Sequence, residues 1–168
     1  MEPIFIDFEA SSLDLISSYP IEVGIASQQG GVQSWLIRPA PLWSDWSIEA
    51  EHLHGLTRNQ LEAEGTNAVE VAHLLNQHIP AVCYCDAWSY DSFWFHRLFK
   101  AARVQPTFRL ESITHLLNTQ QMARWSEIRK HVIKDTGWDT HRAGNDARIL
   151  LETWHQVREF SLIEPGIN

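Results

Sequence analysis

The stretch "IFIDFEASSL", residues 4–13, combines the pattern of a buried strand with two carboxylates. Its apolar residues occupy both faces, which is typical of a strand at the centre of a sheet. Asp7 and Glu9 interrupt this pattern two residues apart, and side chains at i and i+2 point to the same side of a strand. Two adjacent carboxylates at the end of a buried strand lose hydration and repel each other, so they require cations nearby. The stretch therefore predicts a central strand that carries a charged site.

The composition is that of a globular protein, and we expect one domain spanning residues 1–168. Hydrophobic residues make up 44% and charged residues 20%, which argues against long disordered segments. The net charge of −8 disfavours a protein that coats membranes or nucleic acids through a basic surface. Bound cations can still reverse the field at one site. Without a signal-peptide pattern or an apolar run of membrane-spanning length, we expect a cytoplasmic protein with no membrane partner, in which Cys83 and Cys85 are reduced.

Hydrophobic periodicity predicts an α/β fold with a mixed β-sheet covered by helices. The turn "QQGG" joins the second and third strands, so the first three strands should form an antiparallel meander. The later strands alternate with helices and should therefore be parallel. The irregular segment 38–47 is either a wall of an active site or a packed surface loop. Strands are expected at about 3–9, 20–27, 32–38, 81–87 and 108–112. A short helix is expected before residue 57, and further helices at about 67–79, 92–102, 113–135 and from 142 onward.

Acidic residues also stand at two later places where a helix is expected to begin. Asp91 follows the fourth strand, and Asp146 follows His141 by five residues. Taken singly, each residue has an ordinary structural explanation. Asp91 could be a helix N-cap, Asp146 a first-turn acid favoured by the helix dipole, and His141 a surface or satisfied core residue. Together with Asp7 and Glu9, however, the two aspartates form a set of four carboxylates, the oxygen ligands that Mg²⁺ and Mn²⁺ prefer. Two such ions, about 3.5–4 Å apart, promote in-line phosphoryl displacement, and a nearby histidine can take the proton from water.

Three segments, "DFEASSL", "SYDSFW" and "HRAGND", occur in this order and contain the patterns Asp-x-Glu, aromatic-Asp and His-x-Ala-x-x-Asp. The segments "YPIEVGIA" and "HGLT" lie between the first and the second. With these five segments the chain resembles the DEDDh branch of the 3′–5′ exonucleases, relatives of the proofreading epsilon subunit of bacterial polymerase III. The matching segments extend over residues 4–155, nearly the whole chain.

The resemblance implies a ribonuclease H-like fold and a metal-dependent 3′–5′ exonuclease that uses two divalent metal ions, Mg²⁺ or Mn²⁺. The partner would be the 3′ end of single-stranded or frayed DNA or RNA, which is shortened to nucleoside 5′-monophosphates. His141 would be the general base. The implied metal ligands are Asp7, which bridges both ions, Glu9 and Asp146 at the ion that activates water, and Asp91 at the second ion. The implied substrate-binding residues are Ala10, Ser11, Leu13 and His54.

Two departures from the family pattern leave alternatives open. One extra residue in the second motif makes Asp86 a rival to Asp91 as a metal ligand, and Ser11-Ser12 replaces the more usual Thr-Gly.

Other residues could contact nucleic acid. Trp88 either stacks on bases or packs in the core. The arginines considered as phosphate contacts, each also readable as a solvated surface charge, are Arg38, Arg58, Arg97 and Arg103.

Two other functions compete with the exonuclease. One is a non-catalytic nucleic-acid-binding or polymerase-accessory module on the same fold. The other is a metallophosphoesterase that acts on small nucleotides. The acidic net charge favours short substrates, because long strands bind more tightly to basic grooves. The sequence distinguishes neither DNA from RNA as the substrate nor a monomer from a homodimer.

Overall fold

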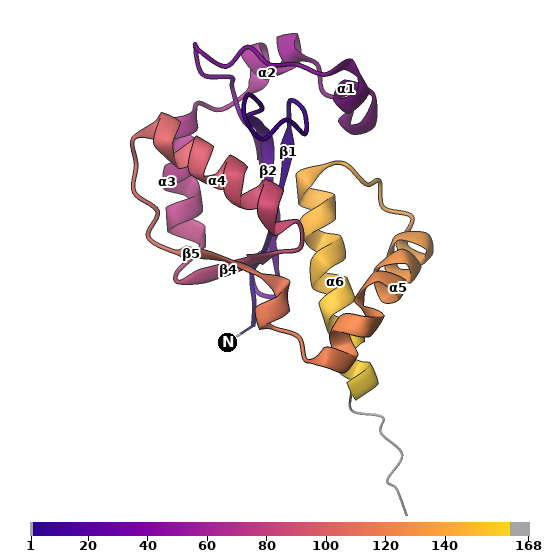
Figure 1. Ribbon diagram of the computed structural model, residues 1–168. Helices are drawn as coiled ribbons and strands as arrows, with labels where there is room; N and C mark the ends of the chain where they lie inside the picture. The colour runs from indigo at the N-terminus through magenta and orange to yellow at the C-terminus, as the bar shows by residue number, and fades with distance from the viewer. Residues whose placement is uncertain (1, 162–168) are drawn as a thin grey trace, which may run out of the picture.

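The computed structural model describes residues 2–161, which contain a five-stranded mixed sheet and six α-helices (Figure 1). The sheet order is β3-β2-β1-β4-β5, with β2 antiparallel to both of its neighbours and with β1, β4 and β5 parallel to one another. This confirms the predicted α/β class, a three-stranded meander extended by parallel strands. The strands are β1 (Phe5–Ala10), β2 (Pro20–Ser27), β3 (Gly31–Leu36), β4 (Val82–Cys85) and β5 (Arg109–Ser112).

The helices begin and end at local signals that explain where the predicted boundaries were wrong. Gly55, in the left-handed conformation, ends α1, which lies where the short helix before residue 57 was expected. Thr57 caps α2, a helix that was not predicted. A capping box between Asn118 and Gln121 starts α5 and separates it from a short 3₁₀ turn. The helices are α1 (Ile48–His54), α2 (Arg58–Glu64), α3 (Ala68–His78), α4 (Trp88–Ala102), α5 (Thr119–Thr136) and α6 (Ala143–Ser161), and the 3₁₀ turn is η1 (Ile113–His115).

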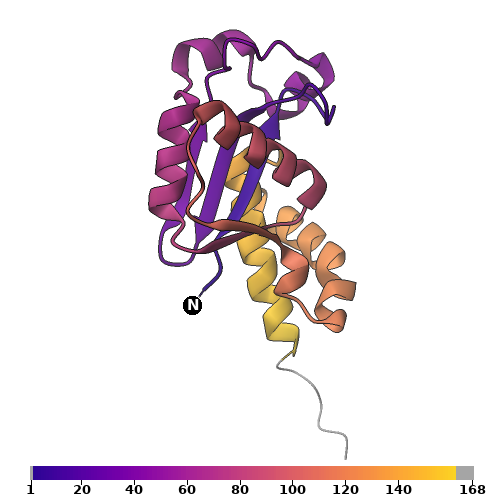
Figure 2. The ribbon, with the colours of Figure 1, turned by 60° about the vertical axis from the view of Figure 1, so that its left-hand side comes forward.

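Helices cover both faces of the sheet, and the alternation along β1 assigns each of its residues to one of them. Figure 2 shows α4 in front of the sheet and α6 behind it. Ile6 and Phe8 belong to the core beneath α3 and α4, whereas Phe5 packs against Trp154 of α6. Asp7 and Glu9 alternate with Ile6 and Phe8 and therefore share the face of Phe5. The two carboxylates consequently lie on the face covered by α6.

The N-terminus of α6 rests directly on the backbone of β2. A Cβ atom added to Gly24 would lie 2.2 Å from the carbonyl carbon of Ala143 and 2.3 Å from the amide nitrogen of Gly144. Gly24 is the register partner of Asp7 on β1. The close approach of the β2 and α6 backbones at this point therefore places the start of α6 next to the acidic end of β1.

Cys83 and Cys85 are free and buried on β4, as the sequence predicts. Within residues 2–161, each helix falls short of the length or the apolar character required to cross a bilayer.

Replacement of Gly24 by Ala is expected to lower the free energy of unfolding by at least about 1–3 kcal/mol, because backbone atoms of α6 occupy the space of the new methyl group. The matched control is Gly30→Ala, whose Cβ would meet only the Ser27 hydroxyl, at 2.9 Å, and that side chain can rotate. Urea denaturation of both variants measures the difference. Equal stabilities of the two variants would contradict a tight contact between α6 and β2.

Candidate metal centre and its cleft

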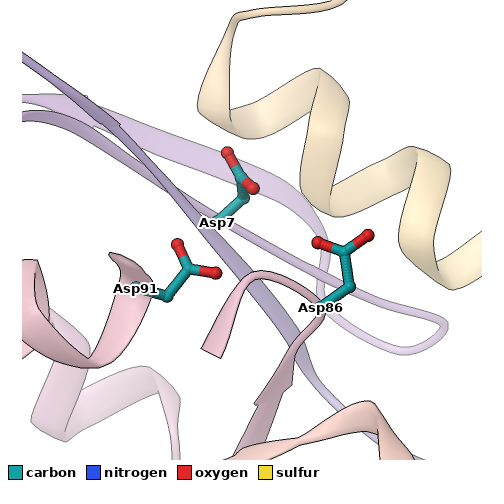
Figure 3. Close-up of side chains that lie close together, drawn as sticks. All are labelled: Asp7, Asp86 and Asp91. Carbon is teal, nitrogen blue, oxygen red and sulfur yellow. The ribbon is translucent and has the colours of Figure 1, made fainter. Parts of the chain in front are cut away.

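Five carboxylates converge where β1 and β4 end and where α4 and α6 begin. Ligand oxygens of Asp7, Asp86 and Asp91 all lie within 4.8 Å of one another, and the same holds for Asp7, Glu9 and Asp146. Asp7 belongs to both groups, so it stands at the centre of the site. Figure 3 shows the first group, with the carboxylates of Asp7, Asp86 and Asp91 directed toward a common space.

The parallel pairing of β1 with β4 explains how Asp86 and Asp91 reach Asp7. Parallel strands end at the same edge of a sheet, so the chain leaves Cys85 close to the end of β1 and enters α4 there. Asp91 lies in the first turn of α4, which begins at Trp88 without a side-chain cap; the predicted start near residue 92 was therefore wrong. Asp91 is 1% exposed, and its Oδ2 has no hydrogen-bond partner among the described residues.

The loop before α6 holds Asp146 and His141 in a fixed relation. Asp146 Oδ2 accepts a hydrogen bond of 2.7 Å from the backbone N–H of His141. His141 has a φ of 63°, a left-handed conformation that is uncommon for a non-glycine residue. Its side chain is exposed and lines the cleft above the carboxylates. The turn thus directs one imidazole toward the acidic site.

Glu22, on β2, fastens this turn to the sheet. Its carboxylate accepts hydrogen bonds from Arg142 Nε at 3.0 Å and Nη2 at 2.8 Å, and from the backbone N–H of Ala143 at 3.0 Å. Glu22 is 2% exposed and is the register partner of Glu9. A bidentate pair between an arginine and a buried carboxylate fixes the orientation of both groups as well as binding them. Sequence analysis missed Glu22, although an acid inside the apolar segment "YPIEVGIA" is the same kind of signal as Asp7 and Glu9.

The electrostatics of the site oppose the ionisation of its own carboxylates. Burial, followed by the charges of Asp91 and Asp146, raises the pKa of Asp7 well above its ordinary value. Burial and then the charge of Asp146 raise the pKa of Glu9 from 4.5 to about 8. For Asp91, burial and then the charge of Asp86 raise the pKa from 3.8 to about 8. Carboxylates that repel one another in a buried site are stabilised by a bound cation.

The donor set fits a hard divalent cation. All five side chains offer carboxylate oxygens, the ligands that Mg²⁺ and Mn²⁺ prefer over soft metals. The buried Oδ2 of Asp91 still lacks a partner, and each group of three carboxylates is compact enough to share an ion. The residues present therefore fit a metal centre.

The cleft above the carboxylates has a volume of about 530 Å³, within the usual range of ligand pockets, about 300–1,000 Å³. Tyr90 and Trp94 of α4 form an aromatic side of the cleft. Leu13 also lines it and is 68% exposed, so an apolar side chain stands free beside the acidic site. Trp88, at the start of α4, is 42% exposed and outside the core.

Ser11 lies beneath the surface rather than in the cleft. It is fully buried, its hydroxyl donates to Asp45 and accepts from the backbone N–H of Tyr19, and its own backbone N–H and C=O are hydrogen-bonded. Ser12 and Ser17 also donate to Asp45. Partial burial raises the pKa of Asp45, but the three serine hydroxyls outweigh burial and hold that pKa below its ordinary value. The hydroxyls of Ser11 and Ser12 therefore hold the loop that presents Leu13.

Of the two options predicted for segment 38–47, the structure favours the packed loop, because none of its residues lines the cleft. Trp43 is buried and stacks on Tyr19 with ring centroids 5.1 Å apart, while Asp45 anchors the loop that carries Leu13. The segment is packed, and it acts on the site through that loop.

Ala10 and His54 are both buried and do not appear among the residues that line the cleft. Ala10 follows a register shift in the pairing of β1 with β2. His54 Nδ1 accepts a hydrogen bond from the backbone N–H of Leu56, so Nε2 carries the proton of the neutral ring. Burial lowers the pKa of His54, and its Nε2 has no partner among the described residues.

Solved structures with this arrangement of strands and helices include those of exonuclease I. The zinc-bound complex of E. coli exonuclease I with single-stranded DNA matches with a TM-score of 0.75 at 13% identity, over 96% of this chain and 41% of that chain. The fold of this chain is similar to that of the matched part of exonuclease I. The enzyme from Methylocaldum szegediense gives a TM-score of 0.76 at 12% identity, with 96% and 41% covered.

At this level of identity the likeness to exonuclease I concerns the fold, and it confirms the predicted ribonuclease H-like architecture. This chain spans about two fifths of the length of these exonuclease I chains. Comparison with protein-family models and with curated protein sequences gives no match.

The metal-free protein is expected to lose thermal stability as the pH rises from about 5 to about 9. Glu9 and Asp91 have folded-state pKa values of about 8, above 4.5 and 3.8, so the folded state binds more protons than the unfolded state in this window. A divalent cation binds the ionised forms and offsets their repulsion, so Mn²⁺ should raise Tm more at pH 9 than at pH 5. Thermal unfolding followed by circular dichroism, in EDTA and in Mn²⁺, measures both effects.

In EDTA, Asp91→Asn should flatten this pH dependence because it removes one of the carboxylates whose pKa is raised and relieves the repulsion of Asp7. The exposed Asp135→Asn is the control and should keep the dependence of the unmodified protein. A Tm in EDTA that increases toward pH 9 would show that the carboxylates are not mutually repelled as the geometry indicates.

Glu22→Gln is expected to reduce the free energy of unfolding by about 1.5–3 kcal/mol, the range for hydrogen bonds to charged groups, and to weaken Mn²⁺ binding by loosening the turn at His141. The control is Glu62→Gln, which also removes an arginine partner, but from an exposed pair with Arg58. That change should cost no more than about 1 kcal/mol. Urea denaturation and Mn²⁺ titration distinguish the two variants. Similar losses of stability and of Mn²⁺ affinity in both would argue against a role for Glu22 in holding the turn at His141.

Proposed function

We propose that residues 1–168 form one exonuclease domain that hydrolyses phosphodiester bonds at the 3′ end of single-stranded or frayed nucleic acid. The observation that carries this proposal is the convergence of five carboxylates beside an exposed histidine at one end of the sheet. The order of these residues along the chain is that of the exonuclease motifs. The exonuclease I structures with the same fold include a zinc-bound complex with single-stranded DNA and a complex with a dA16 oligonucleotide.

Two divalent ions, Mg²⁺ or Mn²⁺, would bind at the two carboxylate groups, with Asp7 shared between them. Glu9 and Asp146 would complete one group, and Asp91 the other. Bound there, the ions would lower the pKa of the attacking water and offset negative charge on the phosphate.

His141 would act as the general base. Its exposed imidazole lines the cleft, and a neutral ring nitrogen would accept the proton of the attacking water. The water oxygen forms a bond to phosphorus, and the bond from phosphorus to the 3′ oxygen of the preceding nucleotide breaks, which releases a nucleoside 5′-monophosphate. Asp146 would keep the imidazole in position through its hydrogen bond to the His141 backbone.

The apolar part of the cleft would receive the terminal nucleotide. Leu13 is well exposed for contact with its base, and Tyr90 offers an aromatic edge on the opposite element. Ser11 would contribute by fixing the loop, because its hydroxyl is already bonded to Asp45. Ala10, at the register shift, and His54, whose Nε2–H has no partner among the described residues, would contribute to this subsite from its buried side.

The test is the shortening of 5′-labelled single-stranded DNA and RNA oligonucleotides in Mg²⁺, Mn²⁺ or EDTA, with chromatographic identification of the product. Stepwise loss from the 3′ end with release of nucleoside 5′-monophosphates is expected, and only with a metal. His141→Ala should reduce the rate by about 10²–10⁴-fold, the usual contribution of a general base. The exposed His131→Ala is the matched control. Binding of the oligonucleotides without any shortening would favour the non-catalytic module instead.

The same assay separates Asp91 from Asp86 as metal ligands. We expect nearly complete loss of activity in Asp7→Asn and Asp91→Asn and a milder loss in Asp86→Asn, because Asp86 is the more exposed of the two rivals and already faces Arg129. Retained activity in Asp91→Asn together with complete loss in Asp86→Asn would reverse their roles.

A further inference from the structure

Arg129 extends from α5 into the acidic cleft. Its neighbours Ile128 and Val132 are buried against α6, while Arg129 and Ile133 line the cleft. Arg129 Nε lies 3.5 Å from Asp86 Oδ2, and Nη2 lies 3.6 Å from Asp146 Oδ1. The guanidinium therefore faces one carboxylate from each of the two groups around Asp7.

These ion pairs are long, and the guanidinium is incompletely satisfied. Charge-assisted N–H···O bonds are usually about 2.7–2.9 Å long, shorter than either contact of Arg129. Its Nε is buried without a hydrogen-bond partner among the described residues. By contrast, the guanidinium of Arg142 binds Glu22 at 2.8 and 3.0 Å. Arg129 is thus placed by the fold but held loosely by its partners.

Charge balance gives Arg129 a particular place in the cleft. Among the described residues that line it, five are carboxylates and Arg129 is the one with a permanent positive charge. Two divalent cations would bind the same carboxylates that face the guanidinium. A planar group with several donors then suits a phosphate, whose oxygens it can bind in pairs.

We propose that Arg129 is a phosphate-binding residue that serves as a resident counter-cation until divalent metal binds. On metal binding, its guanidinium leaves Asp86 and Asp146 and donates to non-bridging oxygens of the phosphate in the cleft. The phosphate contact rests on the proposed function, whereas the competition with metal for the carboxylates does not. No arginine suggested by the sequence plays this part: Arg97, for example, donates to the backbone carbonyls of Ile16 and Ser17.

The first experiment measures Mn²⁺ binding by titration calorimetry without nucleic acid. Arg129→Met removes a cation that competes for Asp86 and Asp146, so it should bind Mn²⁺ roughly threefold to tenfold more tightly. Lys130→Met, an exposed neighbour on α5 with the same change in charge, should match the unmodified protein. Arg129→Lys keeps the charge and should lie between them. Unchanged or weaker Mn²⁺ binding in a folded Arg129→Met protein, as judged by circular dichroism, would overturn the counter-cation role.

The second experiment measures binding of a fluorescent single-stranded oligonucleotide in Ca²⁺ by anisotropy. Arg129→Met should weaken binding about tenfold relative to Lys130→Met, and Arg129→Lys should restore only part of it because it lacks the paired donors. Equal binding by the two methionine variants would overturn the phosphate contact. Tighter Mn²⁺ binding in Arg129→Met, combined with no 3′ shortening by the unmodified protein, would refute the exonuclease and leave the counter-cation role intact. If the unmodified protein binds no Mn²⁺, the proposed exonuclease function and the counter-cation role of Arg129 are both refuted.

Discussion

The contact between the start of α6 and the backbone of β2 is the constraint on which the site depends. Gly24 lets the two backbones meet where a single methyl group would not fit, and Glu22 binds Arg142 and the Ala143 amide two residues away along the strand. Asp7 and Glu9 are the register partners of these two β2 residues. Because α6 is held at this point, Asp146 and His141 arrive beside carboxylates that lie more than 130 residues earlier in the chain.

The same geometry concentrates negative charge where a stable fold would disperse it. Burial and mutual repulsion raise the pKa values of Asp7, Glu9 and Asp91, so the metal-free site is at odds with the ionised state of its own side chains. Functional sites commonly depart from the rules that stabilise the rest of a fold. Here the surrounding structure compensates: the β1 residues of the opposite face, Ile6 and Phe8, lie in a large apolar core that keeps the strand in place.

Residue patterns were sufficient to predict those site residues whose charge is unexpected in their local sequence. Carboxylates within an apolar strand or at the start of a helix stand out, and Asp7, Glu9, Asp91 and Asp146 do converge. The meander followed from a turn signal, and the parallel extension from alternating elements. The rest depended on tertiary packing. Asp45 binds serine hydroxyls more than 25 residues away, and Arg129 looks like any polar residue at the border of the apolar face of α5. The start of α4 was misplaced because Asp91 resembles a cap, whereas the true start at Trp88 has none.

The two carboxylate groups differ in how firmly the protein holds them, and this difference bears on the rivalry between Asp86 and Asp91. Asp91 is 1% exposed inside the first turn of a helix, so its buried oxygen has little freedom to seek another partner. The side chain of Asp86 is 23% exposed at the end of β4 and faces a loosely paired guanidinium. A rigid carboxylate fixes the position of a bound ion. A more mobile carboxylate can exchange one cationic partner for another as metal ions bind in the cleft and dissociate. Asp86 and Arg129 together therefore form the adjustable side of a site that is otherwise fixed by the sheet and by the starts of two helices.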